Sequence, residues 1–161
     1  MEFTRYQLYD LINRPGENKW LQGTDLSEAD LRWVQLPEVN LCGANLTKAN
    51  LSGADLSQAY LDEANLSEAK LINADLTDAF VYNARLINAD LKKANLTNAN
   101  LSDSDLSGAD LSDANLVNAN LKGADLSRAI LTRANLDRVQ LKGAKYNKDT
   151  QWPAGFNLQT S

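Results

Sequence analysis

The chain has 161 residues and a formal net charge of -5, with one cysteine, Cys42, and no histidine. This length predicts one domain with a core of its own. The missing histidine and the single cysteine exclude zinc sites built on His and Cys, disulfide frameworks and His-dependent catalytic triads. The mild negative charge argues against non-specific binding to nucleic acids.

Residues 1–23 are predicted to form an N-terminal cap. Several apolar residues in this segment can share one face of a short helix that "NRPG" ends, namely Phe3, Tyr6, Leu8, Tyr9, Leu11 and Ile12. The segment contains no apolar run typical of a secretory signal, and no stretch of the chain is long and apolar enough to predict a membrane span. We therefore expect a cytoplasmic protein without membrane contact.

A five-residue repeat follows the cap. Every fifth residue from Leu26 to Leu141 is Leu, except Val81, and the residue two places before it is usually Ala. The residue directly before the Leu is most often Asp or Asn, so the unit is A-(D/N)-L-x-x. A period of five fits neither a helix nor a regular strand.

Each unit is therefore predicted to be a short extended piece followed by a corner, with Ala and Leu pointing inward. Four such sides close one coil of about twenty residues, and coils would stack at the strand spacing of roughly 4.8 Å. The Asp or Asn before each Leu is expected to bond backbone N–H groups at the turn.

The repeat, seen as "ANLTK", "ANLSG" and "ADLSQ" over residues 44–58, resembles that of the pentapeptide-repeat proteins. The resemblance covers residues 24–143 and extends to Ala144 and Tyr146 as a degenerate unit. It implies an all-β fold, a right-handed quadrilateral β-helix of about six coils. The expected division is 1–23 for the N-terminal cap, 24–146 for the β-helix and 147–161 for an irregular C-terminal cap, with Tyr146, Trp152 and Phe156 covering that end.

The sequence predicts no catalytic, metal-binding or cofactor-binding residues. It contains no phosphate-binding glycine loop, no G-x-S-x-G, no H-E-x-x-H and no pair of cysteines. Cys42 has no histidine to activate it, so we expect it to be inert. The chain is therefore predicted not to be an enzyme.

Counting in twenties identifies a candidate protein-contact patch within "DAFVYNARL" and the coil before it. Tyr60 and Phe80 fall in one column, Tyr82 stands beside them, and Asp62 and Glu63 adjoin. Aromatic residues in register on adjacent coils can stack. The patch is either a ladder that stiffens the coils or a surface that contacts a protein partner.

A second candidate is an acidic strip on one face, made of Glu38, Asp55, Asp75 and Asp78, with no base on that face before Arg138. The resembling family includes gyrase-protecting members whose acidic rods resemble duplex DNA. The alternative function is therefore an acidic DNA mimic that binds a DNA-binding enzyme such as gyrase. Against it, bases interleave with the acids along the repeats and cancel much of the negative field.

Basic residues gather toward the C-terminus, where they either steer a partner or form only a solvated surface: Lys122, Arg128, Arg133, Arg138, Lys142, Lys145 and Lys148.

The first prediction for function is a non-enzymatic protein-protein interaction scaffold that presents flat faces. Its partner is expected to be a protein, with no direct binding of nucleic acid and no membrane contact. The chain itself is expected to be a monomer or weak dimer.

Overall fold

The computed structural model describes residues 21–157, so the helix expected near the N-terminus lies outside the described residues. Within 21–157 there is no helix, and extended structure occurs only as single bridging residues separated by turns. This part of the chain accordingly holds no helix that could cross a bilayer.

Each five-residue unit is an extended piece closed by a β-turn, as the unit around Leu66 illustrates. The Ala69 N–H donates to the Leu66 carbonyl at 3.0 Å, which closes the turn. Asn65 donates its N–H to the preceding coil at 2.9 Å, and Leu66 and Glu68 donate theirs to the following coil at 2.7 and 2.9 Å. Because nearly every unit repeats these bonds, each inner coil is held by backbone hydrogen bonds from both neighbours.

The third residue of each turn has a positive φ. Glycine takes this position in some units, but nineteen non-glycine residues also adopt it, from Glu28 to Arg138, with φ between 53° and 62°. A positive φ at the third position is typical of type II turns, and it costs a non-glycine residue about 1 kcal/mol or more. The backbone bonds between coils therefore impose a conformation that most of these side chains disfavour.

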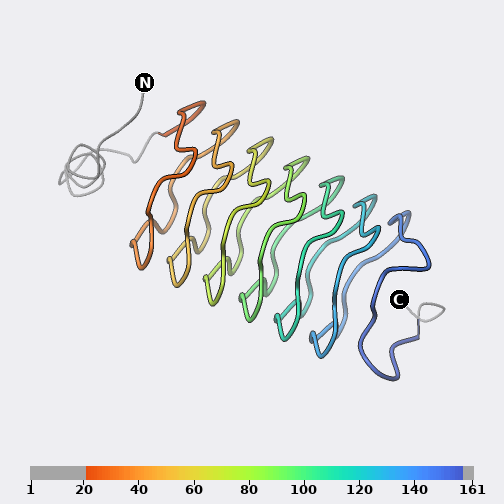
Figure 1. Cartoon of the computed structure of the whole chain (residues 1–161). Helices are drawn as coiled ribbons and strands as arrows, with labels where there is room; N and C mark the ends of the chain where they lie inside the picture. The colour runs from red at the N-terminus through yellow and green to blue at the C-terminus, as the bar shows by residue number, and fades with distance from the viewer. Residues whose placement is uncertain (1–20, 158–161) are drawn as a thin grey trace.

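Bridging residues are twenty apart, from the pair Asp25 and Asn45 to the pair Asp125 and Lys145. One coil thus takes twenty residues, or four units, and the coils stack in parallel from one end of the molecule to the other (Figure 1). This spacing confirms the four-sided coil that the repeat predicts.

We name the four sides by their central residues. Side I is centred on Leu21 and every twentieth residue after it; sides II, III and IV are centred in the same way on Leu26, Leu31 and Leu36. Each side also carries outward-facing residues, one directly before the central residue and two directly after it.

The central residues and the Ala residues fill the interior, as predicted. Every central side chain from Leu21 to Leu131 is at most 3% exposed, and Val81 is fully buried. Ser104 replaces one Ala, and its buried hydroxyl donates to the Leu101 carbonyl at 2.6 Å. The core is therefore one continuous apolar column with its polar exception satisfied.

The Asp or Asn before the central residue accepts a hydrogen bond from the backbone N–H two residues later, which confirms the predicted turn role. Asn65 Oδ1 accepts from the Ser67 N–H at 3.1 Å and from the Ser67 hydroxyl at 2.7 Å. Asp125 Oδ1 accepts from the Ser127 N–H at 2.9 Å. Asp and Asn interchange in the repeat because the turn needs only this oxygen.

The twenty-residue register ends near the C-terminus. Gln151 pairs with Ile130, which lies twenty-one residues before it. Trp152 and Phe156 then pack against the core with their rings stacked at 5.3 Å, and Tyr146 meets Trp152 edge-on at 5.6 Å while remaining 50% exposed. Trp152 and Phe156 thus contact the core after the last regular coil. The C-terminal cap expected over residues 147–161 stays a prediction.

Candidate protein-contact surface

The aromatic patch, which we define as Tyr60, Phe80 and Tyr82, lies on side I. Tyr60 and Phe80 are bridged in register on successive coils, and their ring centroids lie 5.0 Å apart with an interplanar angle of 4°. The predicted stack is therefore confirmed. Tyr60, Phe80 and Tyr82 nevertheless remain 44%, 42% and 43% exposed, although the stack covers one ring face each of Tyr60 and Phe80.

Asp62 supplies the hydrogen-bond acceptor that Phe80 cannot supply at its own turn. An Asp or Asn in place of Phe80 would accept a hydrogen bond from the Tyr82 N–H, as equivalent residues do throughout the coils. Phe80 has no such oxygen, and Asp62, one coil earlier, accepts from the Tyr82 N–H at 2.9 Å instead. One carboxylate of the candidate site thus also holds the backbone under the aromatic patch.

Cys42 lies on side I in the preceding coil, where the negative charges of Asp62 and Glu63 act on its thiol. Burial raises the pKa of the Cys42 thiol, and the charges of Asp62 and Glu63 raise it further. A protonated thiol is a weak nucleophile. The environment of Cys42 therefore gives it no catalytic activation.

The acidic strip, defined as Glu38, Asp55, Asp75 and Asp78, lies on side IV. Asp55 and Asp75 are bridged in register and are half-buried, because each accepts hydrogen bonds from its own turn. Asp78 is exposed and accepts from the Asn98 amide at 2.9 Å. Asp55, Asp75 and Asp78 thus accept hydrogen bonds that stabilise the coils, and they also contribute negative charge to side IV.

The strip and the patch are adjacent. Asp78 ends side IV two residues before Phe80 begins side I in the next coil. Glu38 stands in the same way two residues before Asn40, which is bridged to Tyr60. We call the strip, the patch, Asp62 and Glu63 together the acidic–aromatic surface.

This surface has no positive charge of its own. Between residues 21 and 120, sides IV and I carry no Lys or Arg, and their acids are Glu38, Asp55, Asp62, Glu63, Asp75, Asp78 and Asp103. Over the same residues, sides II and III carry six bases: Arg32, Lys48, Lys70, Arg85, Lys92 and Lys93. Charge is therefore unevenly distributed around the rod as well as along it.

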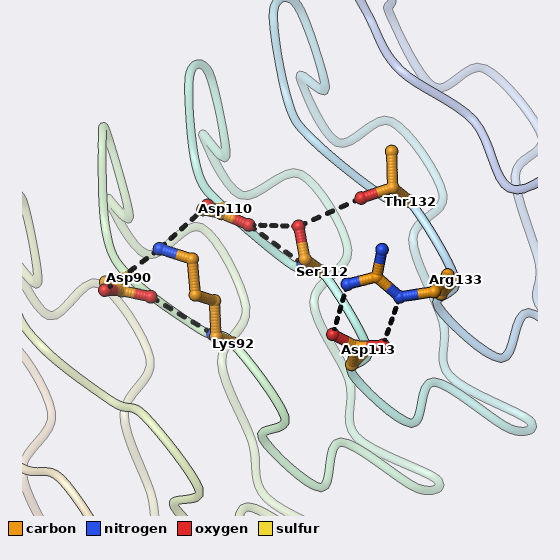
Figure 2. Close-up of polar contacts among 7 residues, drawn as sticks. All are labelled: Asp90, Lys92, Asp110, Ser112, Asp113, Thr132 and Arg133. Carbon is orange, nitrogen blue, oxygen red and sulfur yellow. Dashed lines mark hydrogen bonds and ion pairs between the residues drawn. The ribbon is translucent and has the colours of Figure 1, made fainter.

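Side III shows the contrast, since its acids pair with bases of the same side, as Lys92 and Arg133 illustrate (Figure 2). The Lys92 ammonium lies 3.4 Å from an Asp90 oxygen and 3.0 Å from an Asp110 oxygen. Arg133 and Asp113 form two parallel hydrogen bonds of 2.7 Å each. These contacts link successive coils and satisfy the acids of that side.

The pKa values of these acids reflect their partners. Burial raises the pKa of Asp110, but hydrogen bonds from Ser112 and Lys92 outweigh it and hold the pKa below its usual value. The hydrogen bonds from Arg133 lower the pKa of Asp113. Side III is thus a self-compensated surface.

Trp33 is an exposed aromatic residue that sequence reasoning missed. It is 70% exposed on side III, and a Cβ atom at Gly53, one coil later, would overlap its ring. The glycine therefore provides the space over which the indole lies. Counting twenty residues from Trp33 to Gly53 is the signal that would have found this pair.

The basic end of the chain lies beyond the acidic–aromatic surface. Arg138 lines a cavity of about 480 Å³ between residues 134–139 and 153–157, and its Nε lies 4.0 Å from an Asp137 oxygen. Among residues 21–157, no group of three or more Cys, Asp or Glu side chains is placed to hold a metal ion.

The model of the pentapeptide repeats matches residues 24–62, 49–86, 82–116 and 109–145, in eight copies. The chain belongs to the pentapeptide repeat family. Its fold is therefore the right-handed quadrilateral β-helix of that family, in agreement with the four-sided coil described above.

Solved pentapeptide repeat proteins resemble the chain. Rfr23 from the cyanobacterium Cyanothece 51142 is 31% identical over 83% of this chain and 91% of that one, with a TM-score of 0.54. HetL from Nostoc sp. strain PCC 7120, involved in heterocyst differentiation regulation, is 32% identical over 78% and 73%, with a TM-score of 0.43. QnrB1, a plasmid-mediated fluoroquinolone resistance protein, is 20% identical over 77% and 78%, with a TM-score of 0.38. No curated protein gives a significant match.

Proposed function

We propose that this pentapeptide repeat protein is a non-enzymatic scaffold that contacts a protein partner through its aromatic patch. The observation that carries the proposal is the gathering of three half-exposed rings on side I, next to carboxylates. Exposed apolar patches with polar rims are typical of protein-contact surfaces. Stacking alone accounts for Tyr60 and Phe80, but Tyr82 lies outside the stacked pair.

The backbone under the patch supports this role. Phe80 donates its N–H to the Ala59 carbonyl at 2.9 Å, and Val81 donates to the Asn100 carbonyl at 2.7 Å. The rings are therefore held on a hydrogen-bonded frame before any partner arrives. A preorganised surface loses little conformational entropy on binding.

The test replaces the patch with residues already found in the same columns, as Tyr60→Asn, Phe80→Asn and Tyr82→Ser together. Asn at both positions restores the turn oxygen found at Asn100, so we expect the unfolding midpoint to change little. Partner capture from the native extract, followed by mass spectrometry, should lose the captured protein. A variant that loses stability but keeps its partner would contradict a contact role for the patch, and so would one that keeps both.

A DNA mimic is the competing function, and the shared acidity of sides IV and I favours it. Asp55→Asn, Asp75→Asn and Asp78→Asn together remove three charges and keep the turn oxygens, as Asn95 and Asn115 do in the same column as Asp55 and Asp75. Gyrase supercoiling is the readout. Inhibition by the wild type that this variant loses would place the DNA mimic ahead of the scaffold.

A further inference from the structure

We propose that the acidic–aromatic surface binds a basic polypeptide segment, one that combines arginine or lysine with apolar side chains. The inference rests on the proposed function, because it uses the aromatic patch as the apolar anchor. It adds the chemical class of the partner.

Sides IV and I are acidic and hold no compensating base over residues 21–120. On side III, by contrast, Asp90 and Asp110 pair with Lys92, and Asp113 pairs with Arg133. Uncompensated carboxylates attract cations and repel anions. A nucleic acid, a phosphorylated peptide or an acidic segment is therefore disfavoured on this surface.

Two carboxylates beside the rings are available to a partner. The side-chain carboxylates of Glu38 and Glu63 form no hydrogen bond or ion pair with any of the residues 21–157, and both residues are exposed at turns. Glu38 borders the column of Tyr60 on side IV, and Glu63 follows Tyr60 on side I. Negative charge thus lies on both sides of an apolar centre.

This arrangement selects for mixed chemistry in the partner. Basic groups that pair only with exposed carboxylates gain little, because water and salt screen them. Apolar side chains packed on the ring edges add affinity and exclude water from the neighbouring ion pairs. A segment with both kinds of side chain matches the surface better than a purely basic one.

The experiment measures fluorescence anisotropy of labelled peptides that repeat Arg-Gly-Leu, Arg-Gly-Ser or Glu-Gly-Leu. The test variant is Glu38→Gln with Glu63→Gln, and the matched control is Glu28→Gln with Glu68→Gln. All four residues occupy the same turn position with positive φ, but the control pair lies on side II.

We expect Arg-Gly-Leu to bind best and Glu-Gly-Leu not to bind. The test variant should weaken Arg-Gly-Leu binding roughly threefold to tenfold and reduce its salt dependence, and the control variant should change it less than about twofold. Equal losses in both variants would mean that net charge alone attracts the peptide, which overturns the inference.

The other outcomes separate the inference from the proposed function. Equal binding of Glu-Gly-Leu would overturn the basic partner and leave an apolar contact surface intact. If the variant lacking the three patch aromatics binds Arg-Gly-Leu like the wild type and captures the same proteins, the proposed function fails as well. Self-association in sedimentation velocity that the test variant abolishes would assign the surface to a second copy of the chain, and this also overturns the inference.

Discussion

At the scale of single residues, Asp62 accepts the turn hydrogen bond that Phe80 cannot accept. Its Oδ1 accepts from the Tyr82 N–H at 2.9 Å, which is the bond that an Asp or Asn at position 80 would otherwise make. The turn after Phe80 therefore depends on Asp62 for this hydrogen bond.

Asp62→Ala is expected to destabilise the protein by about 1 kcal/mol more than Asp62→Asn, because only the Asn keeps an oxygen for the Tyr82 N–H. Denaturant unfolding of both variants measures the difference. Equal stabilities would show that the Tyr82 N–H finds another acceptor.

The turn carboxylates predict acid sensitivity. The Ser127 hydroxyl and N–H lower the pKa of Asp125 below the ordinary value of 3.8. A lowered native pKa means that the ionised group contributes stability fully above the unfolded pKa, and that this stability is lost as pH falls through the native pKa. Asp125→Asn keeps the turn oxygen, so its unfolding midpoint should fall less than that of the wild type below about pH 4.

The reverse substitution provides the control. Asn65 occupies the same column as Asp125, and its oxygen makes the same turn bonds to Ser67. Asn65→Asp should therefore increase the loss of stability on acidification. Parallel acid profiles for Asp125→Asn, Asn65→Asp and the wild type would refute the carboxylate origin of the effect.

The turn role of Asp and Asn could be predicted from sequence because donor and acceptor lie two residues apart. The bond from Tyr82 to Asp62 could not, because its partners lie twenty residues apart and Asp62 does not stand in the usual acceptor position. Local chemistry is readable from one sequence, whereas a compensating contact between coils needs the structure.

At the scale of the turn, the period of five predicted where the chain bends, but not how. Side chains such as Glu63 and Arg128 give no signal for positive φ, yet both adopt it. The reason is physical: three backbone hydrogen bonds per unit to neighbouring coils outweigh the local preference of one residue.

Alanine substitutions at Gly43 and Gly53 distinguish the free-energy cost of a positive φ from the cost of a contact with the Trp33 ring. Both have positive φ, of 63° and 67°, but only at Gly53 would a Cβ atom meet the Trp33 ring. Gly43→Ala should cost about 1 kcal/mol from φ alone, and Gly53→Ala should cost more, because the ring must also move.

A double-mutant cycle isolates the ring contact. In a Trp33→Ala background, Gly53→Ala should cost the same as Gly43→Ala, since the overlapping ring is gone. If the excess cost of Gly53→Ala persists without Trp33, the contact between these coils is not its cause.

At the scale of the whole molecule, the fold was predictable because the same small unit recurs and its apolar residues line one axis. The stack of Tyr60 and Phe80 was also predictable, by counting in twenties. That the acidic strip and the aromatic patch are adjacent was not predicted from the sequence, because each of them was assigned to its own face. Asp78 and Phe80 are two residues apart and lie on either side of one corner.

The most direct test of the acidic–aromatic surface is amide chemical-shift mapping with the Arg-Gly-Leu peptide. Binding should shift the backbone amide resonances of sides IV and I, with the largest changes at Tyr60, Glu63, Asp78 and Tyr82. Shifts confined to side III around Asp110, or spread evenly around the coils, would contradict binding at the acidic–aromatic surface.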